Sequence, residues 1–179
     1  IYVTVTPPVT LPVGVKIYAT VEVSGATAVL KNLRQNRYVK LNTATHPSTS
    51  GGTYSLGLSD VYRIVSIMEG ASSASYADIA SGVAGTDVTN QFTLDNGQRD
   101  NEYKNARIIK KNGSSISLTS KKLVIKLDYF THDGNAPTGN YCTINSYPID
   151  DTGVTAATIK TADIPVFTST LYEIGRAHV

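Results

Sequence analysis

Apolar and polar residues alternate with a period of two through much of the chain, and this pattern predicts β-strands. In residues 123–130, LVIKLDYF, the odd-numbered positions are apolar and are predicted to point inward, whereas Asp128 is predicted to point outward. Residues 15–23, VKIYATVEV, show the same pattern. No helical period lasts beyond about two turns. Many short strands separated by Gly, Pro and Asn predict an all-β fold, an antiparallel β-sandwich of immunoglobulin-like type with long connecting loops.

Other stretches give more specific predictions. Residues 28–42, AVLKNLRQNRYVKLN, are interpreted as two short strands. Residues 61–68 are apolar at successive positions, which favours a central strand covered on both faces. Residues 141–147, YCTINSY, are predicted to form a late strand. Between the strands, residues 69–87 are rich in Ala, Ser and Gly and predict a long excursion with a helical turn around residues 76–80.

The chain is interpreted as one main domain with flanking segments. We assign residues 23–172 to the sandwich, with a sub-boundary near 70–86 as the alternative to a single unit. Residues 1–22 are interpreted as a linker or the end of a preceding domain. The last residues, 173–179, read EIGRAHV, which resembles a translated short-read sequencing adapter, so we expect this tail to be non-native.

Charge and hydropathy exclude several classes of function. Sixteen basic and fourteen acidic residues give a net charge of +2, which does not indicate a nucleic-acid partner. No apolar run approaches the roughly 20 residues of a membrane span, and the first residues lack the basic start of a signal peptide.

The sequence also lacks the motifs of common enzymes. It contains neither the Gly-x-Ser-x-Gly turn of a nucleophilic serine nor a phosphate-binding glycine loop. His46, His132 and Cys142 show no paired spacing of the kind that zinc requires. We therefore predict no cofactor, no metal and no enzymatic activity.

Residues 94–103, LDNGQRDNEY, form the densest polar stretch of the chain. Asn-Gly is a favoured pair for a tight turn because both residues tolerate positive φ. The residues that follow are too polar to form a plain returning strand, so we predict a structural corner with Asp95, Arg99 and Asp100 in a buried polar network. If so, Arg99→Ala should cost several kcal/mol. The predicted structural motif comprises Asp95, Asn96, Gly97, Gln98, Arg99, Asp100, Asn101 and Tyr103.

A family resemblance rests on this stretch and on segments around it. The residues that carry it are 56–67, 95–101, Tyr103, Arg107, 128–130, 146–147 and 164–165. Together they resemble a domain of uncharacterised virion structural proteins of large contractile-tailed bacteriophages, including phages of marine cyanobacteria. The chain departs from the family pattern at Lys104 and Asn105, where another acidic residue would be expected.

The resemblance implies a non-enzymatic structural part of a phage tail, baseplate or fibre, as a fragment of a larger protein. It further implies a place in the virion and contacts with other virion proteins in an oligomeric assembly. It supplies no catalytic residues.

Two alternatives remain open at the level of sequence. One is a carbohydrate- or receptor-binding sandwich, which would bind a host-surface glycan through loops such as residues 131–140. It would be assisted by calcium if the oxygen-bearing side chains of the polar stretch converge, although their spacing is not that of an EF-hand. The other is an adhesion repeat of a bacterial surface protein.

Overall fold

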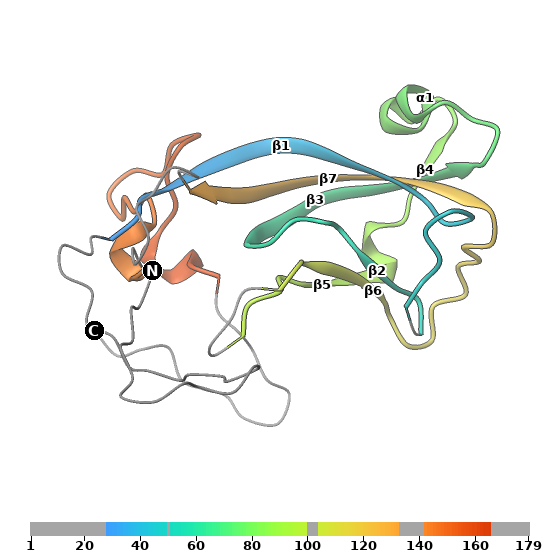
Figure 1. The fold of residues 1–179 in the computed structure, drawn as a ribbon. Coiled ribbons are helices and arrows are strands. Elements are labelled where there is room, and N and C mark those ends of the chain that lie inside the picture. Colours follow the sequence, from blue (N-terminus) through green and yellow to red (C-terminus); the bar gives the residue numbers. More distant parts are fainter. Residues whose placement is uncertain (1–27, 50, 100–103, 133–141, 166–179) are drawn as a thin grey trace, which may run out of the picture.

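The computed structural model describes residues 28–49, 51–99, 104–132 and 142–165. Within them the chain is mostly strand, with one short α-helix and three 3-10 helices (Figure 1). In chain order the elements are β1 (Lys31–Asn42), β2 (Thr53–Ser55), β3 (Val61–Ala71), α1 (Tyr76–Ser81), β4 (Gly85–Asp87), η1 (Thr89–Gln91), β5 (Phe92–Asp95), β6 (Arg107–Lys110), β7 (Lys121–His132), η2 (Ile144–Ser146) and η3 (Thr161–Asp163).

The strands form two antiparallel sheets, one with the order β1-β7-β3-β4 and one with the order β2-β6-β5. In Figure 1 the long, curved four-stranded sheet lies above the shorter one. The prediction of an all-β fold made of antiparallel sheets is confirmed, and the immunoglobulin-like strand order stays a prediction. The predicted strand at residues 15–23 and the predicted non-native tail at residues 173–179 lie outside the described residues.

The main core fills the space between the two sheets. Its buried side chains come from both, and include Leu41, Ile67, Leu123, Ile125 and Leu127 of the larger sheet with Tyr54, Phe92 and Ile108 of the smaller one. Burying a large apolar side chain contributes about 1.5–3 kcal/mol, so these contacts are the main force that holds the sheets together.

β7 lies at the centre of the larger sheet, between β1 and β3. Its predicted inward face is confirmed, because the apolar side chains at 123, 125 and 127 are fully buried. Asp128 was predicted to point outward, but it is not in contact with solvent: it is only 1% exposed. Its carboxylate accepts hydrogen bonds from the backbone N–H of Asn36 at 2.7 Å and from Arg63 Nε at 2.7 Å. The two neighbouring strands therefore cover Asp128.

β1 is one strand of twelve residues, so the prediction of two short strands is wrong. A β-bulge between Arg34 and Arg37 interrupts the alternation without ending the strand. Within it, Asn36 has a φ of 53°, in the left-handed region that asparagine tolerates. Because of the extra residue, odd-numbered positions before and after the bulge point to opposite faces of the sheet. Leu33 packs in a second apolar cluster, whereas Val39 packs on the main core.

The outer face of the larger sheet, which points away from the smaller sheet, is covered at its two ends. α1 lies over one end, where fully buried Ile79 packs against Gly70 of β3. The predicted helical turn is thus confirmed, and Ser75 caps it by accepting a hydrogen bond from the N–H of Asp78 at 3.1 Å. The prediction that β3 is covered on both faces is wrong in its middle, where Val65 is 40% exposed.

Residues 142–165 pack against the other end of the sheet and share a second apolar cluster with it. Its members are Phe130, Tyr147 and Ile159, with Leu33, Tyr62, Ile149 and Ile164 packed against them. The strand predicted at residues 141–147 is wrong where the structure describes it, because Ile144–Ser146 form η2. Thr143 Oγ1 accepts from the N–H of Asn145, and the N–H of Thr143 donates to Ser146 Oγ. These local bonds satisfy backbone groups that a strand would pair across a ladder.

Candidate functional site

The sequence predicts a structural corner after β5, and the structure describes this stretch as far as Arg99. Arg99 donates hydrogen bonds to both carboxylate oxygens of Asp95, at 3.1 and 2.8 Å, and Arg107 Nε lies 3.6 Å from Asp95 Oδ2. The bonds from Arg99, helped by the N–H of Gly97, hold the pKa of Asp95 below its usual value. The side chains of Arg99 and Asp95 remain 23% and 20% exposed, so this pair is partly solvated. From the sequence, we expected it to be buried.

Two successive bonds from side chain to backbone shape residues 95–98. Asp95 Oδ1 accepts from the N–H of Gly97 and Asn96 Oδ1 accepts from the N–H of Gln98, both at 3.0 Å. Gly97 has a φ of 81°, and a Cβ atom at this position would collide with the carbonyl oxygen of Lys104. The positive φ expected at Gly97 is present, but Asn96 does not share it, and the tight Asn-Gly turn stays a prediction. Glycine is required at 97 both by its φ and by the close approach of another backbone segment.

Gln98 connects the corner to a buried polar network that lies beyond it. Its side chain donates from Nε2 to Asp60 Oδ1 at 2.7 Å and to Tyr147 Oη at 3.1 Å. The residue is 9% exposed. Its two partners come from the segment before β3 and the segment after η2, so a single amide joins three distant parts of the chain.

Lys31 supplies the positive charge of this network. Its ammonium group donates to Asp60 Oδ2 at 2.5 Å and to Tyr147 Oη at 2.9 Å. The side chains of Lys31 and Asp60 are only 2% and 8% exposed. Burial alone would lower the pKa of Lys31, but the bonds to Asp60 and Tyr147 outweigh it and hold that pKa above its usual value. Lys31 therefore stays charged.

The network is held against aromatic rings at the end of the sheet. The Lys31 ammonium lies 4.2 Å from the centroid of the Tyr147 ring, and Phe130 meets that ring edge-on at 4.9 Å. Asp60 adopts a φ of 56°, and its carbonyl accepts from the N–H of Phe130 at 3.0 Å. A cavity of about 380 Å³ adjoins this network, with Lys31 and Asp60 in its wall.

The structure places part of the predicted motif and adds residues that the sequence analysis missed. Asp95 through Arg99 lie at the corner, whereas Asp100, Asn101 and Tyr103 lie outside the described residues. The predicted contact of Arg99 with Asp95 is present, and its contact with Asp100 stays a prediction. Lys31, Asp60 and Tyr147 were missed, because each stands alone in its local sequence and no spacing links them.

Two searches cover the part of the chain that the structure describes, one for groups of metal ligands and one for membrane-spanning helices. There, no group of three His, Cys, Asp or Glu residues is placed to hold a metal ion. His46, His132 and Cys142 are all exposed, and the last two contribute to the wall of the cavity beside the network. No helix in the described ranges is long and apolar enough to cross a membrane.

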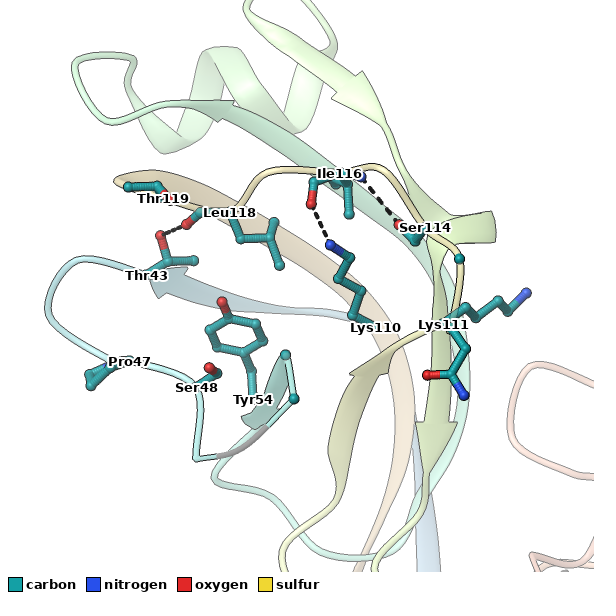
Figure 2. Close-up of a pocket in the computed structure, with 14 residues that line it drawn as sticks. Thr43, Pro47, Ser48, Tyr54, Lys110, Lys111, Ser114, Ile116, Leu118 and Thr119 are labelled. Carbon is teal, nitrogen blue, oxygen red and sulfur yellow. Dashed lines mark hydrogen bonds between the residues drawn. The ribbon is translucent and has the colours of Figure 1, made fainter.

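A second and larger cavity, of about 540 Å³, opens where the β1–β2 loop meets the segment between β6 and β7. Figure 2 shows Tyr54, Lys110 and Leu118 around its centre. Tyr54 is 6% exposed, and this burial raises the pKa of its hydroxyl, an effect that a hydrogen bond with Ser48 partly offsets.

The chain was compared with known proteins in three ways. A search of protein-family models, of curated proteins and of solved structures found no match to this chain. The virion resemblance therefore stays a prediction from the sequence.

Proposed function

We propose that the chain is a non-enzymatic structural module of a contractile-tailed bacteriophage particle, part of a tail, baseplate or fibre-associated protein. It would reside in the virion and contact other virion proteins in an oligomeric assembly. The support from sequence is the resemblance of residues 95–101 and the segments after them to virion domains.

The observation that carries the proposal is the position of Gln98. This residue belongs to the resembling stretch, and its amide lies in the buried network with Asp60 and Tyr147. Next to it, Arg99 is paired with Asp95. A stretch whose side chains turn inward onto their own domain favours a framework role over a role in catalysis.

Satisfied polar groups favour the same role. Among the described residues, no buried side-chain nitrogen or oxygen lacks a hydrogen-bond partner. Catalytic groups are often left poised or strained for reaction, whereas fully paired networks rigidify a fold. A module that transmits load in a particle needs this kind of rigidity.

Immunogold labelling tests the proposal. Antibodies raised against the purified domain are applied to particles and host cells from a phage–host culture that carries the gene. Gold on phage tails or baseplates is the expected result, with peptides of this chain co-purifying with tail proteins in mass spectrometry. Gold on the bacterial envelope, with particles unlabelled, would overturn the virion assignment in favour of an adhesion protein.

A further inference from the structure

The larger cavity contains a lysine that is held in place at three points. The backbone N–H of Lys110 donates to the carbonyl of Gly52 at 3.1 Å. Its stem lies on Gly52, where an added Cβ would come within 2.8 Å of Lys110 Cβ. Its ammonium group donates to the carbonyl of Ile116 at 2.7 Å, a bond drawn in Figure 2. An ammonium that is positioned before a ligand arrives loses little side-chain entropy when it binds.

Lys110 retains donors for a ligand. An ammonium group has three donor protons, and among the described residues only the bond to Ile116 uses one. No aspartate or glutamate is found among the described residues that line the cavity. The adjacent Lys111 also borders the cavity, and it is a natural contrast because its side chain points away from Tyr54 in Figure 2. The cavity therefore presents one oriented positive charge with no fixed counter-charge.

The rest of the wall is rich in hydroxyl groups. They belong to Thr43, Ser48, Tyr54, Ser114 and Thr119. Thr43 is committed, since its hydroxyl donates to the carbonyl of Leu118 at 2.5 Å and accepts from the N–H of Lys121 at 2.9 Å. Thr119 is exposed. Such a wall suits a ligand that carries hydroxyl groups of its own and disfavours an apolar one.

We propose that this cavity binds an acidic sugar, with the carboxylate on Lys110 and the ring hydroxyls on the hydroxyl-bearing wall. The volume of about 540 Å³ exceeds what a lone carboxylate fills and lies within the usual range for small-molecule sites. The site differs from the loop at residues 131–140, where the sequence suggested glycan binding. It does not depend on the virion role, since a bacterial surface protein could use the same chemistry.

In the test, the full chain is titrated separately with three compounds, two sodium salts and one neutral sugar, and binding is followed by amide chemical shifts in NMR. Glucuronate is the probe, glucose is the matched sugar without the carboxylate, and acetate is the carboxylate without the sugar. We expect saturable binding of glucuronate in the millimolar range, at least about tenfold tighter than either control. Acetate binding as tightly as glucuronate, or no saturable shift with glucuronate, would overturn the proposal.

Variants locate the site. Lys110→Gln is expected to weaken glucuronate binding at least about tenfold, and Lys111→Gln to leave it within about twofold. Thr119→Ala provides a second reading if Lys110→Gln does not fold, and is expected to weaken binding about threefold without changing the unfolding midpoint. Equal loss for both lysine variants, or full binding by a folded Lys110→Gln, would contradict the assignment. If Lys110→Gln does not fold, unchanged binding by Thr119→Ala would contradict it.

Discussion

Asp60 and Asp95 each accept hydrogen bonds from a basic side chain, but their surroundings are opposite. Asp95 pairs with Arg99 four residues away, and both side chains keep about a fifth of their surface in water, at 20% and 23%. Asp60 pairs with Lys31 from a distant strand, with side-chain exposures of 8% and 2%. Surface pairs contribute little, whereas breaking a buried pair leaves a charge without solvent or partner.

The comparison separates a local feature from a framework feature. The pair at Asp95 shapes its own turn, together with the N–H of Gly97. The network at Asp60 joins the start of β1, the start of β3, the corner through Gln98 and the later segment through Tyr147. The amide of Gln98, which is neutral, therefore connects more of the fold than the charged residue beside it.

Asp60→Asn is expected to have the largest effect on stability. Asparagine tolerates the φ of 56° at this position, so the substitution leaves the backbone in place while it removes the charge and replaces one acceptor oxygen by an NH2 donor. The Lys31 ammonium is then buried without a counter-charge, which costs about 3–5 kcal/mol in the free energy of unfolding. Urea denaturation at pH 7 measures this loss.

The control is the double variant Lys31→Met with Asp60→Asn. It removes both charges and is expected to be clearly more stable than Asp60→Asn alone. A double variant as unstable as the single one would mean that the shape of the site matters and the charge pair does not.

Gly97→Ala is expected to cost about 2–4 kcal/mol, and Gly113→Ala is its matched control. The two glycines have φ values of 81° and 80°, so alanine meets the same backbone strain at both. Only at Gly97 would the new Cβ collide, with the carbonyl of Lys104, whereas nothing lies within 4 Å at Gly113. Thermal and urea unfolding of both variants give the difference, and equal costs would contradict the close approach.

Gln98→Ala is expected to cost about 1–3 kcal/mol, because it removes a buried donor from Asp60 and Tyr147. Gln91→Ala is the control. Among the described residues, the Gln91 side chain donates only to the neighbouring, exposed Asn90, so its loss should stay within about 0.5 kcal/mol. Similar costs for the two glutamines, measured by urea denaturation, would remove Gln98 from the framework.

The sequence predicted local features well. Alternation placed the inward face of β7, and Asn96-Gly97 indicated the positive φ at Gly97. Both depend on residues adjacent in the chain, for which periodicity and turn chemistry are direct physical signals. The same local reasoning failed at β1, because the bulge before Arg37 looks in the sequence like the end of a strand.

Long-range partners could not be predicted in this way. Asp128 falls on a polar position of an alternating strand, and only the bulges of the two neighbouring strands bring Asn36 and Arg63 over it. Lys31 and Asp60 are 29 residues apart with no pattern between them. The sequence predicted a corner around Gln98, but it contained no signal for the residues that Gln98 contacts, Asp60 and Tyr147.

Arg99→Ala is expected to have the smallest effect of the set, about 0.2–1 kcal/mol at pH 7, because its pair with Asp95 is partly solvated. This replaces the larger cost expected from sequence. The pKa of Asp95 is lowered in the folded protein, so the pair stabilises the fold above the ordinary aspartate pKa of about 3.9. That stabilisation is lost as pH falls through the lowered pKa. The difference between parent and variant should therefore shrink toward zero in strong acid and also in high salt. Urea denaturation across pH 2–7 measures it, and a loss of several kcal/mol that persists in acid would show that Arg99 acts through buried contacts instead.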